Sequence, residues 1–185
     1  MRKNEHLTNT MVYPNFFDED KITHCLSNST YLGPGIPVQI RTCSIYVIND
    51  NDDIVKYINE FIKKINNKFY NFDIVDIDGE DIPKRFEYTS AENGKFDEHL
   101  DIGSNPQSST RKISYSIQLT DGDEYEGGDL VFWPKSTYNS PELRKMRRQK
   151  GSIIFFPSYM VHAVTPVTKG VRNALVGWVN GNPFR

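Results

Sequence analysis

The sequence has little of what marks secreted, membrane-spanning or nucleic-acid-coating proteins. Two cysteines, Cys25 and Cys43, are too few for a secreted scaffold held together by disulfides. No apolar run approaches the roughly 20 residues of a membrane-spanning helix. The basic N-terminus MRKNEHLTNT lacks an apolar core, so we expect no secretory signal. The net charge of −2 argues against a uniformly basic surface. We therefore expect a cytoplasmic protein with reduced thiols and no membrane association.

The 185 residues give room for one ordinary domain. No segment has the composition of an interdomain linker, and no repeat occurs at solenoid or propeller spacing. We expect a single domain over residues 1–185. Within it, residues 1–71 would form helical and strand decoration, and residues 72–185 would form the core.

The first 48 residues show mixed local signals. Asp18 is suited to cap a short helix that follows it. Residues 31–37 contain two glycines and two prolines, which predicts a loop. Residues 38–48 are rich in β-branched and aromatic side chains, which predicts a strand.

One amphipathic helix and one basic segment with a helical turn are predicted further along the chain. Apolar residues recur at helical spacing over 54–65, with Asn51 or Asp52 as the candidate cap. Residues 135–150 carry six Lys or Arg residues and one acidic residue, and Pro141 is well placed to begin a helical turn there.

The second part of the chain alternates short β-forming runs with Gly, Pro, Asp and Asn. Eight such runs without helical periodicity predict a mainly β fold, a sandwich or jelly roll with the helices on one outer face. The predicted strands cover approximately 72–77, 84–90, 95–101, 111–120, 128–133, 152–156, 160–165 and 172–179.

His99 and Asp101 lie two positions apart in a predicted strand, so their side chains point to the same face. His162 follows a later predicted strand. Two histidines and one carboxylate on one side of a metal form the facial triad of non-haem Fe(II) oxygenases. Taken alone, a His-x-Asp pair is more often a surface or structural feature.

Arg172 strengthens the metal-site interpretation. It lies in the apolar strand VRNALVGW, and a buried guanidinium needs an anionic partner. Its two parallel N–H groups suit a dicarboxylate ligand.

Several motifs occur together in the second part of the chain. They are FDEHLD (96–101), RKISYSIQLT (111–120), YEGGDL (125–130), the block from Gly151 to Val167, and GVRNALVGW (170–178). In this order and spacing they resemble the 2-oxoglutarate- and Fe(II)-dependent dioxygenases, specifically the prolyl-4-hydroxylase-like (PKHD-type) branch of bacteria and their viruses. The resemblance is firm over 72–185 and loose before it. It implies a double-stranded β-helix, the cupin-like jelly-roll barrel.

The resemblance also implies a ligand set and a reaction. His99, Asp101 and His162 would bind Fe(II), and Arg172 would bind the distal carboxylate of the cosubstrate 2-oxoglutarate. With O2, the enzyme would hydroxylate a C–H bond of a peptidyl residue such as proline, giving succinate and CO2. Ascorbate is an additional candidate cofactor.

Three further positions follow from the same resemblance. Tyr88 matches a position where the family often places a tyrosine against the cosubstrate, and Gln118 matches another tyrosine position. Ala174 replaces a serine of many relatives, so one hydrogen bond to 2-oxoglutarate is missing or comes from elsewhere.

Two alternatives remain at this point. The basic segment 135–150 would suit a nucleobase-oxidising enzyme, with nucleic acid as the partner in place of a peptide or protein. A non-catalytic jelly-roll module that binds a carboxylate ligand would also use the pocket.

Overall fold

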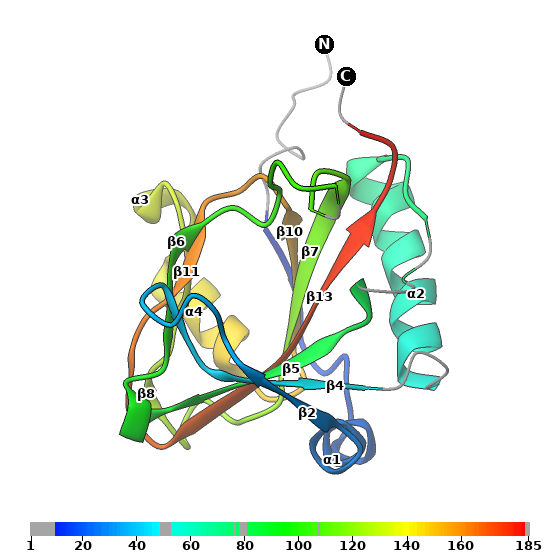
Figure 1. Ribbon diagram of the computed structural model, residues 1–185. Coiled ribbons are helices and arrows are strands. Elements are labelled where there is room, and N and C mark those ends of the chain that lie inside the picture. Colours follow the sequence, from blue (N-terminus) through cyan, green and yellow to red (C-terminus); the bar gives the residue numbers. More distant parts are fainter. Residues whose placement is uncertain (1–9, 49–52, 76, 78–80, 107, 184–185) are drawn as a thin grey trace.

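The computed structural model describes residues 10–48, 53–75, 77, 81–106 and 108–183. Two antiparallel sheets face each other across a core (Figure 1). A short two-stranded ribbon, β8 (Glu126–Gly127) with β12 (Val167–Lys169), lies beside them. This is the double-stranded β-helix that the sequence predicts.

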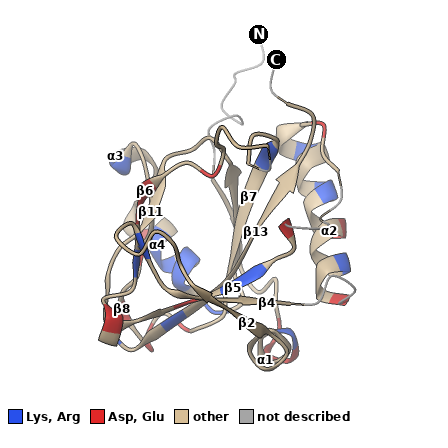
Figure 2. Ribbon diagram, in the orientation of Figure 1, with Lys and Arg blue, Asp and Glu red and all other residues tan. Residues whose placement is uncertain are grey.

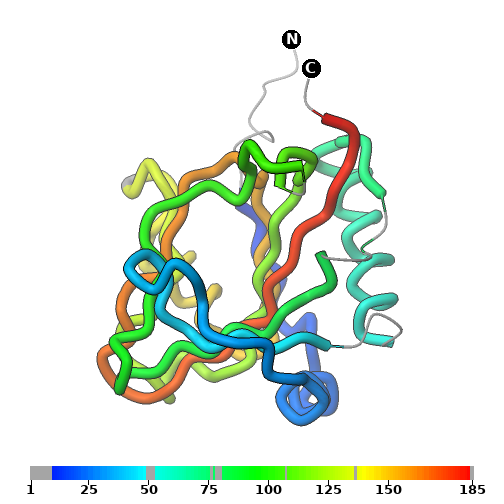
Figure 3. The backbone as a smooth tube through the Cα atoms, in the orientation of Figure 1, coloured from blue at the N-terminus to red at the C-terminus, as the bar shows by residue number. Residues whose placement is uncertain are grey.

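The larger sheet has seven strands and forms the centre of the molecule. Strand β13 runs between β7 and β5, both of which come much earlier in the sequence (Figure 3). In spatial order the strands are β1 (Met11–Tyr13), β10 (Ile153–Pro157), β7 (Arg111–Gln118), β13 (Val171–Asn180), β5 (Lys84–Thr89), β4 (Ser44–Val47) and β2 (Thr30–Pro34).

The smaller sheet carries two of the predicted ligands. In spatial order its strands are β3 (Arg41–Thr42), β6 (Lys95–His99), β11 (His162–Val164) and β9 (Leu130–Phe132). The first 71 residues therefore contribute strands to both sheets.

The helices lie outside the sheets. Asp18 caps α1 by accepting a hydrogen bond from the amide of Lys21, as the sequence predicts. The predicted caps Asn51 and Asp52 lie outside the described residues. Among the described helices, none is long and apolar enough to cross a membrane. The helical elements are α1 (Glu19–Ser27), α2 (Asp53–Ile65), the π-helix η2 (Asn66–Tyr70), the 3-10 helix η4 (Ser90–Glu92), α3 (Lys135–Tyr138) and α4 (Pro141–Arg148).

Two hydrophobic cores lie on opposite faces of the large sheet. Helix α2 covers one face, where Ile58 and Ile62 pack with Phe155 of β10. The ribbon positions of charged residues lie along the side of this helix that faces away from the sheet (Figure 2), and Lys56, Glu60 and Lys64 are exposed. The second core lies between the two sheets and contains Phe86 and Phe132. This inner core borders the predicted ligands.

Two local predictions were wrong. The Gly- and Pro-containing segment after Thr30 forms strand β2, because at the sheet edge Pro34 needs no ladder donor. Residues 72–75 form no strand. Instead, the side-chain amide of Asn66 donates from Nδ2 to the backbone carbonyl of Phe72 at 2.8 Å. Its Oδ1 accepts from the backbone N–H of Phe72 at 2.9 Å.

The direction of the polar face of β7 was left open by the sequence. Ile113, Tyr115 and Ile117 pack in the core under α2, whereas Ser114 and Ser116 face the interior between the sheets. The strand is thus buried on both faces.

Candidate metal centre

His99, Asp101 and His162 converge at one point, as the sequence predicts. His99 ends β6 and lies directly opposite His162 of β11 in the antiparallel register. Asp101 follows β6, with its two carboxylate oxygens 3.6 Å from His99 Nε2 and 3.4 Å from His162 Nε2. One ligand atom from each residue lies within 4.8 Å of the others.

Backbone carbonyls orient both imidazoles. His99 Nδ1 lies 2.7 Å from the carbonyl oxygen of Asp97, and His162 Nδ1 lies 2.9 Å from that of Met160. Because a carbonyl can only accept, each Nδ1 carries the proton and donates. Each Nε2 therefore keeps its lone pair, which is the arrangement of a metal-binding histidine.

Two serines support the carboxylate of Asp101. Burial raises its pKa, but His162, His99 and a hydrogen bond from Ser114 outweigh burial and hold the pKa below its usual range. The hydroxyls of Ser114 and Ser158 are hydrogen bonded at 2.9 Å, and the carbonyl of Ser158 accepts from the amide of Asp101 at 3.0 Å. The sequence analysis did not identify either serine. Their only signal was the polar side of β7 and the Pro-Ser step after β10.

The environment also keeps His162 neutral. Burial lowers its pKa, Asp101 raises it and His99 lowers it, and the net direction is down. An unprotonated imidazole is the form that binds a metal ion.

An inner cavity extends from the three ligands to Arg172. Tyr88, Ser116 and Leu130 are among its lining residues. Arg172 is 3% exposed, and its guanidinium carbon lies 5.5 Å from the ring centre of Tyr88. Within the described part of the chain, no side chain forms an ion pair or a hydrogen bond with this guanidinium.

A buried cation without a partner lowers the stability of a protein by about several kcal/mol. Arg172 is therefore suited to an anionic ligand. Gly128 leaves space for its side chain. The φ of this glycine is +61°, and a Cβ there would lie 3.1 Å from Cδ of Arg172. The preceding Gly127 also has a positive φ, +70°, so both residues of this turn adopt a backbone conformation that favours glycine.

Tyr88 and Gln118 occupy different places. Tyr88 is buried in the inner cavity beside Arg172, and burial raises its pKa well above the usual tyrosine range. Gln118 lies behind Arg172, where its amide donates to the carbonyl of Thr120 at 2.8 Å and to the hydroxyl of Tyr125 at 3.0 Å. Among the described residues, Gln118 does not line the cavity that contains the metal ligands.

An outer cleft of about 830 Å³ opens on the other side of the ligands. It shares Phe86, Phe96, His99 and Asp101 with the inner cavity. The candidate metal centre thus lies at the junction of a buried cavity that ends in a cation and a wide, open cleft.

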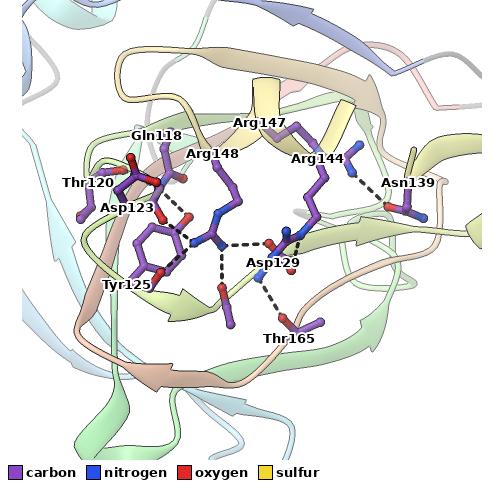
Figure 4. A network of polar contacts seen from close by, with 12 residues as sticks. Gln118, Thr120, Asp123, Tyr125, Asp129, Asn139, Arg144, Arg147, Arg148 and Thr165 are labelled. Atoms are coloured by element: carbon purple, nitrogen blue, oxygen red, sulfur yellow. Dashed lines mark hydrogen bonds and ion pairs between the residues drawn. The ribbon is translucent and has the colours of Figure 1, made fainter. Parts of the chain in front are cut away.

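The basic segment 135–150 turns most of its arginines inward (Figure 4). Arg144 and Arg148 bind the carboxylate of Asp129 at 2.8 and 2.9 Å. Arg147 is buried and donates to the carbonyl of Tyr138 at 2.7 Å. These arginines organise loops, which leaves few basic side chains in this segment for a nucleic-acid surface.

The family follows from comparison with known proteins. Residues 86–180 match the sequence profile of the 2OG-Fe(II) oxygenase superfamily. The chain belongs to this superfamily. The matched region contains all three candidate ligands and Arg172. The donor set of two imidazoles and one carboxylate suits the Fe(II) in the superfamily's name, and unpaired Arg172 suits 2-oxoglutarate.

Curated PKHD-type hydroxylases match about half of this chain. The chain is 37% identical over 92 residues to a PKHD-type hydroxylase of Prochlorococcus marinus (strain MIT 9301), covering 49% of this chain and 38% of that protein. It is 36% identical over 107 residues to one of Xylella fastidiosa (strain 9a5c), covering 53% and 44%. The chain thus spans about two fifths of the length of these relatives.

Solved structures share the fold over nearly the whole chain. A Pseudomonas putida prolyl-4-hydroxylase aligns with a TM-score of 0.70 at 17% identity, covering 95% of this chain and 94% of that one. A prolyl hydroxylase from Trichoplax adhaerens, in complex with a hypoxia inducible factor peptide fragment, aligns with a TM-score of 0.68 at 18% identity, covering 96% and 87%.

Proposed function

We propose that this chain is an Fe(II)- and 2-oxoglutarate-dependent oxygenase that hydroxylates a C–H bond of a peptidyl residue, with proline as the first candidate. Succinate and CO2 are the co-products. One observation carries the proposal: the buried, unpaired cation of Arg172 closes a cavity whose other end is the His99, Asp101 and His162 cluster. A dicarboxylate that also reaches the metal matches both ends.

The three ligands would hold the iron through His99 Nε2, His162 Nε2 and the carboxylate of Asp101. All three donors come from one side of the site, which would leave the side toward the cavity and the cleft for the cosubstrate and dioxygen. When bound, iron, 2-oxoglutarate and dioxygen supply the oxidising power that inserts an oxygen atom into the substrate bond.

Arg172 would bind the distal carboxylate of 2-oxoglutarate through charge-assisted hydrogen bonds. Tyr88 would contact the same molecule, since its phenol lies in this cavity. Ala174 offers no hydroxyl, but Ser116 lines the cavity on the neighbouring strand. We assign to Ser116 the hydrogen bond that a serine at position 174 would make. Gln118 would act behind Arg172, through Tyr125 rather than on the cosubstrate itself.

Phe86, Leu130, Phe156 and Val164 line the rest of the cavity with apolar surface. This lining excludes water from the site and strengthens the electrostatic contacts inside it. The chain's own contribution is therefore to bind, to orient and to keep the reacting centre dry.

A peptide substrate is supported by the shape of the outer cleft and by the relatives. The cleft is open and large enough for several residues of an extended chain. The matched proteins include PKHD-type hydroxylases, and one structurally similar prolyl hydroxylase is in complex with a peptide fragment. Both cysteines are buried and neither forms a disulfide within the described part of the chain, so we keep the reducing cytoplasm as the proposed compartment.

The test is turnover by the purified protein supplied with Fe(II), 2-oxoglutarate and ascorbate in air. We expect slow succinate formation without substrate. A pool of host-cell peptides should accelerate it and acquire products heavier by one oxygen atom in mass spectra. Succinate at the level of a His162→Ala control would refute the oxygenase. Succinate without any oxidised peptide would refute the peptidyl substrate alone and favour another substrate class.

A further inference from the structure

The outer cleft has a one-sided charge. Among its described lining residues the only carboxylate is Asp101, which faces the two histidines. Three basic side chains, Arg41, Lys84 and Arg111, line the same cleft. The remaining walls are largely apolar, formed by residues such as Leu32, Ile36, Ile45, Ile82, Phe86 and Trp178.

Arg111 already has its partners. Its guanidinium binds Asp81 at 2.7 Å, donates to the carbonyl of Asp101 at 3.3 Å and stacks 3.9 Å from the ring centre of Trp178. Asp81 is in turn bound by the side-chain amide of Asn180. Arg111 is therefore part of the cleft wall rather than a cation available to a ligand.

Arg41 is in a different situation. Its guanidinium carbon lies 5.0 Å from the ring centre of Phe96 and 5.5 Å from that of Phe86. One hydrogen bond, from Nη2 to the carbonyl of Ile36 at 3.2 Å, is its only one to a described residue, and Nε is buried without a partner. No described acidic residue forms an ion pair with it. Most of its five N–H groups are thus unused.

The position of Arg41 relates it to the reacting centre. The ring of Phe96 stacks on the imidazole of His99, with ring centres 3.5 Å apart. The guanidinium of Arg41 contacts the same Phe96 ring. These spacings put the guanidinium roughly two to three residues of extended chain from the metal ligand.

The adjoining loop positions the side chain and forms an apolar rim. A Cβ at Gly35 would lie 2.9 Å from Cγ of Arg41, so only glycine lets the loop approach this closely. The next residue, Ile36, lines the cleft and is 71% exposed. A partner with both an acidic and an apolar side chain would match the cation and the rim together.

We propose that Arg41 is a specificity-determining residue that binds a carboxylate of the substrate, an Asp or Glu side chain within about three residues of the oxidised position. The partner is thus an acidic, extended peptide segment with apolar neighbours that pack on Ile36. This inference rests on the proposed function for the identity of the ligand as a peptide. The acidic character of the proposed peptide follows from the basic side chains that line the cleft, because complementary charges favour binding.

Measurements of peptide binding test this role of Arg41 without requiring turnover. The probes are fluorescein-labelled nine-residue peptides with a central proline and alanine elsewhere. Each peptide carries a single Asp, Asn or Lys at one of the three positions on either side of the proline. We expect wild-type protein, loaded with Fe(II) and 2-oxoglutarate without oxygen, to bind the best Asp peptide about tenfold tighter than its Asn counterpart. Arg41→Gln should reduce that ratio to near one, and Arg41→Glu should reverse it in favour of Lys.

Because both affinities are measured on the same variant, the ratio of the affinities for the Asp and Asn peptides is independent of any loss of folded protein. Arg41→Lys should keep the preference for Asp, which separates charge from packing on Phe96. Lys64→Gln removes an exposed charge from α2, on the opposite face of the large sheet, and should leave the ratio as in wild type. A wild-type ratio near one, an unchanged ratio in Arg41→Gln, or no binding of any peptide would overturn the inference. Failure of the proposed function shows separately, as absent succinate formation by the same preparation.

Discussion

At the scale of single residues, the site depends on how each ligand is held. The sequence identifies His99, Asp101, His162 and Arg172 because their chemistry and strand spacing are visible in one dimension. It does not identify Ser114, whose role requires the register of β7 against the loop after β10. Hydrogen bonds between side chains distant in sequence have no local pattern.

Ser114→Ala tests the support of the carboxylate. The change removes the hydroxyl that binds both Asp101 and Ser158, and partners of metal ligands typically contribute about 10- to 100-fold to metal affinity. We expect the apparent affinity for Fe(II) to fall by about tenfold, measured by anaerobic metal titration.

Ser116→Ala is the matched control on the same face of the same strand. It should leave Fe(II) affinity unchanged and weaken 2-oxoglutarate binding instead, because Ser116 lines the inner cavity. Equal effects of the two variants on iron would contradict the assignment.

At the scale of elements, the sequence predicted where helices and strands form better than it predicted which way their side chains point. The amphipathic pattern over 54–65 and the strand patterns around β5, β7, β10 and β13 are confirmed. The basic segment also forms the helix expected after Pro141. That its arginines turn toward the loop before β9 could not be predicted, because a charge-rich helix is usually solvated and the half-buried Asp129 lies in that loop, outside the helix.

Arg148→Met tests this inward orientation. The guanidinium donates to the carbonyls of Gly122, Tyr125 and Gly127 and to Asp129, at 2.6 to 2.9 Å. Its loss leaves those acceptors without their donor, so we expect unfolding free energy to fall by about 2–4 kcal/mol. Urea denaturation measures this.

The control is Lys145→Met on the exposed side of α4, which should change stability by less than about 0.5 kcal/mol. A similarly small change for Arg148→Met would show that the network contributes little. In that case the segment would again be a candidate for an external partner.

At the scale of the whole molecule, the two cores share one sheet. Residues 1–71 contribute strands to both sheets and helix α2 to the outer core, so we propose that residues 1–185 unfold as one unit. Composition and periodicity predicted a core over 72–185 with residues 1–71 as decoration. They could not show that β1 pairs with β10 or β4 with β5, because strand pairing is a long-range property.

The two cysteines report on whether the two cores unfold together, because one lies in each core. Cys25 lies in the core under α2 and Cys43 in the core between the sheets. Burial raises the pKa of Cys43 to about 11, so its reactive thiolate is scarce at pH 8 and becomes more common as the pH rises.

We expect both thiols to resist alkylation at pH 8 and to react at the same rate in moderate urea, as global unfolding exposes them together. Mass spectrometry of the labelled peptides measures both rates. Earlier labelling of Cys25 than of Cys43 would show that the core under α2 opens separately from the core between the sheets.

The central claim is that one cavity joins an iron-binding triad to a cation that binds 2-oxoglutarate. Calorimetric titration of 2-oxoglutarate into anaerobic, Fe(II)-loaded protein tests it most directly, comparing wild type with Arg172→Ala. The account predicts one site per chain in wild type. In Arg172→Ala it predicts affinity weakened by at least about 10-fold with the iron content unchanged. Equal 2-oxoglutarate affinity in the two proteins would contradict it.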